Sequence, residues 1–436
     1  RERVRNMHTR TVRRGLALAT LAGLVAPASA GGVVSGLIVL KEGDALSGST
    51  VASLNAPFTN GLGQVGFVAA LEDGRRAIWY DNAAIFTSDL ALPDSLTGGE
   101  GTMGIGNAGQ FIYSPSVNGA DSVWGQSGLI ATEGTPAPDF TAGFETTFHS
   151  RPQMTDDGTS YWIAGINDGA GGTSTQERIL YRRDAGGVIT GLYRAGDVID
   201  GATIATGSGI DFDYAFSGNN ANSMILFNDA AQSSTSDGRL AVNNVIVAGE
   251  GLATGQGDNW DNFDNMSVNN AGNHVFSGDT DGATSSDEFI AYNGSIALRE
   301  GDAINPGNLT GAVDALSLNN NNEAVFIWDV DSVETLLYAS DAADMTGSTV
   351  ALLSVGDLFD ATGDGVADWI IDDFNASSGI GPGLDFAENG LVYVEVDLES
   401  LDGLVNIEAI ISLRVPAPSG AALLAMSGLL ATRRRR

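Results

Sequence analysis

The sequence predicts an all-β fold, a single β-propeller of seven four-stranded blades. A turn motif, Asn-x-x-Gly-x-x-x-Phe in its clearest form, recurs seven times along the 436 residues. A short apolar strand that ends in an acidic glycine turn also recurs seven times, at a mean spacing of about 52 residues. Two further apolar runs separate these markers, and four antiparallel strands in a repeat of this length are typical of a propeller blade.

The turn motif, which we call the opening turn, predicts where each blade's second strand begins. Its fourth position is always Gly or Asn, the residues that adopt a left-handed backbone most easily. The residue four places later is aromatic or aliphatic, as one face of a strand requires. The copies start at Asn60, Gly106, Thr155, Asn219, Asn269, Asn319 and Ala387, with fourth positions Gly63, Gly109, Gly158, Asn222, Gly272, Asn322 and Gly390.

The second marker, which we call the closing strand, predicts the last strand of each blade. Its acidic residues would either form a ring of carboxylates on one face of the propeller or accept hydrogen bonds from the backbone of their own turns. Turn chemistry is the simpler explanation. The copies are Leu37–Asp44, Ala84–Asp89, Leu129–Gly134, Leu192–Asp197, Val245–Gly251, Ile296–Asp302 and Ala351–Asp357.

The first repeat shows four strands, and the order of the markers predicts how the ring closes. Hairpin turns are expected at Asp73-Gly74 and Asp81-Asn82. The first closing strand precedes the first opening turn, and none follows the last one, so the strand at Leu37 should pair with the strand Ile407–Val415. An open solenoid is the alternative, and it would need capping units. The four strands are Val51–Phe58, Gln64–Leu71, Arg75–Tyr80 and Ala84–Thr87.

The two ends predict export. Residues 1–30 combine basic residues, a short apolar run and Ala28-Ser29-Ala30, the pattern of a signal peptide cut by signal peptidase, with Met7 as a start site. Residues 31–415 form the propeller, and residues 416–436 combine Pro-x-Pro, an apolar run and four Arg. This tail resembles a PEP-CTERM sorting signal, which implies an exosortase-type enzyme as a partner; Ala417 departs from the usual Glu. A plain C-terminal membrane anchor is the alternative, and only this tail would contact a membrane.

The acidic composition suits a secreted, saline or cation-rich setting, and the solubility of a Gly-rich β surface is the simpler explanation of it. The chain has 54 acidic and 21 basic residues and a formal net charge of −33, and ten of the basic residues stand in residues 1–30 and 433–436. Such a body would repel nucleic acid and anionic lipid. No Cys is present, so disulfides and thiolate metal sites are excluded.

The alternating opening turns and Glu-Gly-Asp strands resemble the choice-of-anchor tandem repeat NxxGxxxF proteins of bacteria. The resemblance covers about residues 35–410 and is strongest at Asn60, Asn269 and Asn319. It implies an exported protein with a surface-sorting tail and implies no enzymatic activity.

One loop has the spacing of a calcium site. Oxygen ligands at its first, third, fifth and ninth positions and Gly365 at the sixth match the front of an EF-hand-like loop, with the backbone of Val366 at the seventh. Ile371 replaces the usual Glu at the twelfth position, and an acidic inter-strand turn is the alternative reading. The ligands would be Asp360, Thr362, Asp364, Val366 and Asp368. A weaker candidate combines Asp279, Asp281, Asp287 and Glu288.

Enzyme signatures are poor. No serine nucleophile elbow, zincin helix or phosphate-binding loop appears, and His274 is expected to be a half-exposed strand residue. Trp79, Trp162 and Trp328 sit in strand patterns that favour core packing over a carbohydrate platform. The sequence therefore favours a non-enzymatic surface or matrix scaffold that binds a polysaccharide or surface protein. The alternatives are a secreted glycan hydrolase or lyase and a calcium-stabilised adhesion module.

Overall fold

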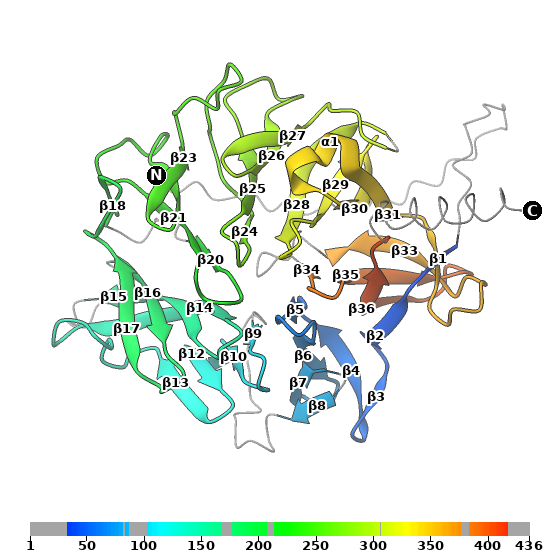
Figure 1. The fold of residues 1–436 in the computed structure, drawn as a ribbon. Helices are drawn as coiled ribbons and strands as arrows, with labels where there is room; N and C mark the ends of the chain where they lie inside the picture. The colour runs from blue at the N-terminus through cyan, green and yellow to red at the C-terminus, as the bar shows by residue number, and fades with distance from the viewer. Residues whose placement is uncertain are drawn as a thin grey trace, which may run out of the picture.

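A ring of small antiparallel sheets surrounds a central axis, as the sequence predicts (Figure 1). The computed structural model describes residues 33–81, 83–86, 103–167, 177–206, 213–305, 307–375 and 383–416. Within these residues seven sheets have four or more strands, and we number them as blades 1 to 7 in chain order. At most junctions the strands nearest the axis of neighbouring blades contact one another.

Blades 1 to 3 occupy the blue to teal part of the ring in Figure 1. Blade 1 contains β3 (Ala45–Leu46), β4 (Ser49–Leu54), β5 (Phe58–Thr59), β6 (Val65–Leu71), β7 (Arg76–Tyr80) and β8 (Ala83–Phe86). Blade 2 contains β9 (Met103–Ile105), β10 (Phe111–Tyr113), β11 (Ser116–Val117), β12 (Ala120–Gly125) and β13 (Gly128–Thr132). Blade 3 contains β14 (Glu145–Met154), β15 (Ser160–Asn167), β16 (Glu177–Arg183) and β17 (Ile189–Arg194), and is followed by the ribbon β18 (Val198–Ile199) and β19 (Ala202–Thr203).

Blades 4 to 7 complete the ring. Blade 4 contains β20 (Asp213–Phe216), β21 (Ser223–Asn228), β22 (Gly238–Val242) and β23 (Val245–Gly249). Blade 5 contains β24 (Met266–Val268), β25 (His274–Asp279), β26 (Glu288–Tyr292) and β27 (Ser295–Arg299). Blade 6 contains β28 (Leu309–Leu318), β29 (Ala324–Val330), β30 (Val333–Ala339), a short helical segment (3-10 Ala342–Asp344, then α1, Met345–Ser348) and β31 (Thr349–Ser354). Blade 7 contains β32 (Leu358–Asp360), β33 (Trp369–Phe374), β34 (Leu384–Phe386), β35 (Leu391–Ser400), β36 (Asn406–Arg414), and β1 (Val34–Ser35) and β2 (Leu37–Lys41) from the N-terminal side.

The hydrophobic core lies between the blades. Seven clusters of buried side chains are present in the described residues, and each joins two neighbouring blades. In β29, Val325 and Ile327 pack toward blade 7, whereas Phe326 and Trp328 pack toward blade 5. This follows from the alternation of side chains along a strand, because both faces of each sheet are covered by a neighbour. Each blade thus depends on two others for its core.

The N-terminal strand closes the ring. β2 pairs antiparallel with β36, with Leu37 opposite Ser412 and Lys41 opposite Ala409. Leu40 is 5% exposed and belongs to the cluster between blades 7 and 1. The predicted closure is therefore confirmed, and the open solenoid is excluded.

The left-handed positions of the opening turns are confirmed in six copies, with Gly63, Gly109, Gly158, Gly272, Asn322 and Gly390 at φ between 62° and 85°. The predicted alignment of the fourth copy, with Asn222 at the left-handed position, is wrong. Asn220 rather than Asn222 has the positive φ, and the Asn220 N–H bonds the Ser217 carbonyl (2.8 Å). The Ser217 N–H donates to the Asn222 carbonyl, which is five residues later in the chain. In blade 5 the equivalent bond, from Asn269 to Asn273, joins residues only four apart. The copy therefore starts at Ser217 and contains one extra residue.

Two further expectations change in detail. The predicted strand Val51–Phe58 is divided into β4 and β5, because Pro57 has no N–H to offer β6. The signal peptide and the sorting tail fall almost wholly outside the described residues, which begin at residue 33 and end at 416. None of the helices in the described part is long and apolar enough to cross a membrane.

Candidate functional site

The opening turns meet around the axis and are hydrogen-bonded to one another in a closed ring. Backbone amides and Asn side chains make these bonds, and every one of the seven blade junctions has at least one. Because the ring closes, each turn is held by both neighbours. The bonds run from Asn60 Nδ2 to Gly106 O (3.1 Å), Asn107 N to Asp156 O (3.1 Å), Asp156 N to Gly218 O (2.8 Å), Asn219 N to Asn270 Oδ1 (2.8 Å), Asn270 N to Asn320 Oδ1 (2.8 Å), Asn320 N to Glu388 Oε2 (3.0 Å) and Asn389 Nδ2 to Gly63 O (3.5 Å).

Two carboxylates stand in this ring. Asp156 of blade 3 reaches across to blade 1, where its Oδ1 accepts the Gly61 N–H at 2.7 Å. Glu388 of blade 7 accepts from the backbone and side chain of Asn320 in blade 6. Burial raises the pKa of Glu388, the Asn320 N–H lowers it, and the charge of Asp156 raises it further. The axial carboxylates are thus engaged in bonds that cross between blades.

Four Asp residues of the closing strands accept hydrogen bonds within their own turns, as turn chemistry predicts. The carboxylates of Asp44, Asp197, Asp302 and Asp357 each accept the backbone N–H of the residue three places earlier, at 2.8 to 3.1 Å. The glycine before each of them has a positive φ, which is 82° at Gly43 and 90° at Gly356. These carboxylates therefore stabilise turns that the strand exit requires.

Blades 5, 6 and 7 share a feature that the sequence did not reveal. In each, a Glu on the third strand lies directly opposite an Asp on the second: Asp279 and Glu288, Asp329 and Glu334, Asp397 and Glu408. Each Glu also accepts a backbone N–H from the first strands of the next blade, just after a register shift there. These bonds come from Val313 to Glu288 (3.0 Å), Phe374 to Glu334 (3.5 Å) and Leu54 to Glu408 (3.1 Å).

Carboxylates that lie close together in a buried place repel unless one holds a proton. Burial, opposed by the Val313 N–H and reinforced by Asp279, raises the pKa of Glu288 to about 9. Burial and a hydrogen bond to Asp373 raise the pKa of Glu334. Burial and a hydrogen bond to Glu408 likewise raise the pKa of Glu395. A neutral carboxyl group therefore sits at each of three adjacent blade junctions near neutral pH.

The predicted calcium loop connects β32 to β33, and its acidic side chains bond backbone amides. Asp360 is fully buried and accepts the N–H groups of Thr362, Gly363 and Gly365, the last at 2.8 Å. Burial raises the pKa of Asp360, but these N–H bonds outweigh it and hold the pKa below its usual range. Asp368 accepts the Ala361 N–H at 2.9 Å.

The rest of this loop is exposed. Asp364 accepts the N–H of Val366 at 2.8 Å, and Gly363 and Gly365 supply left-handed turns. The structure thus has the tight turn that the spacing predicts, with Asp360 and Asp368 on the same segment. In the residues that the structure describes, no group of three or more His, Asp or Glu side chains is arranged to hold a metal ion. No such group is found at the weaker calcium candidate either, within the described residues. There the Asp281 carboxylate accepts hydrogen bonds from the backbone N–H and the side-chain amide of Asn259.

His149 and His274 are both buried, and His274 differs from the expectation. It is 7% exposed rather than half-exposed, with Nδ1 3.2 Å from the Gly272 carbonyl oxygen and its ring parallel to Phe276. Burial lowers its pKa and lowers that of His149 to about 4, so both are neutral at pH 7. Trp162 and Trp328 are fully buried in the core, as expected.

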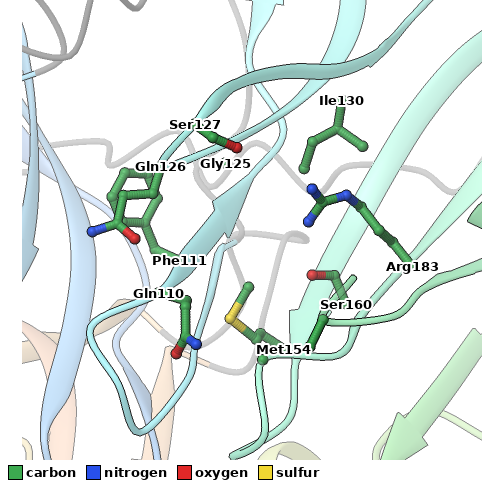
Figure 2. A pocket seen from close by; sticks show the side chains of 11 residues that line it. Gln110, Phe111, Gly125, Gln126, Ser127, Ile130, Met154, Ser160 and Arg183 are labelled. Atoms are coloured by element: carbon green, nitrogen blue, oxygen red, sulfur yellow. The ribbon is translucent and has the colours of Figure 1, made fainter. Parts of the chain in front are cut away.

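A pocket of ≈ 280 Å³ opens between blades 2 and 3, beside their opening turns. Figure 2 shows the Arg183 guanidinium and the Ser160 hydroxyl of blade 3 turned toward its middle, with Gln110 and Gln126 of blade 2 on the other side. Apolar parts of the wall come from Phe111, Ile130 and Met154. Sequence reasoning missed this pocket, because its walls come from two blades and several turns.

Comparison with known proteins gives only distant structural similarity. No family model and no curated protein matches the sequence. Similar solved structures include prolyl oligopeptidase B from Galerina marginata (11% identity, TM-score 0.42, 85% of this chain and 47% of that chain) and an acylaminoacyl peptidase (8%, 0.46, 86% and 54%). A gluconolactonase from Xanthomonas campestris has 11% identity and a TM-score of 0.31 over 70% of this chain and 96% of that one. This chain spans about half the length of the two peptidases, and likeness at this level carries no argument about activity.

Proposed function

We propose that this protein is an exported, non-enzymatic surface or matrix protein whose propeller is a rigid scaffold for binding. The proposal rests on one observation: the polar groups near the axis form hydrogen bonds between neighbouring blades. These groups are Asp156, Glu388 and the Asn side chains of the opening turns. This arrangement favours rigidity over chemistry at the axis.

The carboxyl groups with raised pKa values also support a structural role. A glycoside hydrolase needs a protonated carboxyl group within reach of the sugar. Glu288 and Glu395 are 6% and 4% exposed and lie in the sheets between blades, where a sugar ring has no access. A glycan-acting enzyme would be favoured instead if the purified protein cleaved polysaccharides at a rate lost on changing one acidic pair.

Export rests on the two ends of the sequence and is tested by location. The full chain would be expressed in a Gram-negative host that has an exosortase, and the surface, periplasm and medium would be probed. We expect the mature chain to begin at Gly31 and to be accessible to protease on intact cells. Removal of residues 416–436 should release the protein from the surface. An uncleaved chain confined to the cytoplasm would rule out the proposal.

A calcium-stabilised adhesion module is the second candidate, and the loop Asp360–Asp368 is the observation that favours it. Its tight turn and two carboxylates on one segment are present. Calcium binding would require Asp364 to turn away from the Val366 amide and join them. Thermal melting with calcium and with chelator separates this candidate from the first.

A further inference from the structure

Arg183 has no acidic partner within the described residues, although the chain is strongly acidic. Six of the basic side chains in the described residues form ion pairs with Asp. No carboxylate in those residues forms an ion pair with Arg183, although the whole chain has 54 acidic residues against 21 basic ones. Its guanidinium instead lines the pocket between blades 2 and 3 (Figure 2). Its hydrogen-bond donors are therefore directed to the place where a ligand would sit.

Ser160 provides an independent indication. Its side chain is fully buried, yet within the described residues its hydroxyl has no hydrogen-bond partner. Ser160 and Arg183 are directly opposite each other on β15 and β16, so both line the same wall of the pocket. A buried hydroxyl without a partner is unfavourable, and a hydrogen bond to a ligand oxygen would remove that cost.

Gln110 completes the polar wall from blade 2. Its Oε1 accepts the Ala108 N–H at 3.1 Å, which leaves its amide N–H₂ for other partners. That nitrogen lies 3.0 Å from where a Cβ on Gly158 would be, so a larger residue at position 158 would crowd this side of the pocket. The pocket thus presents one cation and several neutral hydrogen-bonding groups.

We propose that the pocket between blades 2 and 3 binds the carboxylate of a small ligand, with Arg183 as its anchor. A planar carboxylate matches the forked donors of a guanidinium, and a single cation balances one negative charge better than two. The volume of ≈ 280 Å³ lies just below the range of about 300–1,000 Å³ for drug-sized ligands, so the ligand is the size of one sugar or one amino acid. The inference deepens the proposed binding role of the scaffold.

The test is titration of the purified protein with glucuronate and with N-acetylglycine, followed by calorimetry or ligand-detected NMR. Glucose and N-acetylglycinamide are the matched neutral compounds. We expect at least one carboxylate to bind and both neutral compounds to bind far more weakly. Binding of glucuronate alone assigns a sugar acid, and binding of N-acetylglycine alone assigns a peptide terminus. The proposal is overturned if neither carboxylate binds, or if the neutral compounds bind equally well.

Variants locate the binding in this pocket. Arg183→Gln should weaken it about tenfold to a hundredfold, the range expected for charge-assisted hydrogen bonds, and Arg183→Lys should weaken it less. Ser127→Trp changes an exposed rim residue and should block entry without affecting the fold. Arg75→Gln, at an exposed ion pair with Asp73, is the control and should bind as the wild type does. Unchanged affinity in both Arg183→Gln and Ser127→Trp would overturn the site. Cellular location is measured separately, so failure here leaves the export proposal standing.

Discussion

The neutral carboxyl group of Glu288 predicts that the protein loses stability as the pH rises. In the folded state the pKa of Glu288 is about 9, because burial, offset in part by the Val313 N–H, and the neighbouring Asp279 and Asp264 disfavour its charge. In the unfolded chain the same group ionises with its ordinary pKa of 4.5. Between these values the folded state holds a proton that the unfolded state has released, so stability falls with increasing pH.

The size of the effect follows from proton linkage. One such group changes the free energy of unfolding by about 1.4 kcal/mol per pH unit, or about 2 kcal/mol between pH 6.5 and 8. For a body of this length, unfolding entropies predict a shift of roughly 1 °C in Tm for each kcal/mol. The depressed pKa values of His149 and His274 act mainly below pH 6.5 and oppose the trend only at the lower end of this window. Their contribution is the same in the wild type and in a Glu288 variant, so it cancels when the two are compared.

Glu288→Gln isolates the contribution of this residue. The amide mimics the protonated acid, since it can accept the Val313 N–H and donate to Asp279. Measured by thermal melting, the Tm of the variant should exceed that of the wild type at pH 8, and the difference should grow by about 2–3 °C from pH 6.5 to 8. Glu300→Gln is the control: Glu300 lies in the turn after β27, is half-buried and accepts the Gly311 N–H at 2.9 Å, and its substitution should show no such trend. A constant difference for Glu288→Gln would refute a neutral Glu288.

Three further predictions test the opening turn, the closure and the loop. Gly272 has a φ of 85°, so Gly272→Val should lower stability by about 1–3 kcal/mol in thermal melting, whereas Gly272→Asn should be tolerated because Asn322 occupies the equivalent place at 62°. Equal melting of the two variants would contradict this. Leu40→Ala should cost about 2–5 kcal/mol and Leu37→Ala within about 0.5 kcal/mol, because they are 5% and 64% exposed on the same closing strand. Calcium should raise the Tm of the wild type and not of Asp364→Ala if the loop binds it as the spacing predicts; identical midpoints with calcium and chelator in both proteins would remove calcium.

The architecture could be predicted because local patterns repeat. Alternating apolar residues specify strands with two buried faces, and a left-handed Gly or Asn marks each opening turn. The order of the two markers was enough to predict that β2 would pair with β36. The fourth opening turn was predicted to start at Asn219 because Asn is acceptable at several positions of such a turn. Only the hydrogen bond from the Asn220 N–H to the Ser217 carbonyl shows that the turn starts at Ser217 and contains an extra residue.

The acid pairs and the pocket could not be predicted in this way. Asp279 and Glu288 become neighbours through the register of β25 and β26, and their proton is retained because blade 6 covers them. Arg183 meets Ser160 across two strands and faces Gln110 only because blades 2 and 3 pack together.

The sequence by itself determined the strands, the special turn residues, the number of repeats and the way the ring closes, because these depend on spacing along the chain. Only the tertiary structure decided which carboxyl groups are neutral, which polar groups hold the axis together, and where an arginine is left without an acidic partner. Those properties depend on burial and on contacts between blades, and neither is encoded in the order of residues within one repeat.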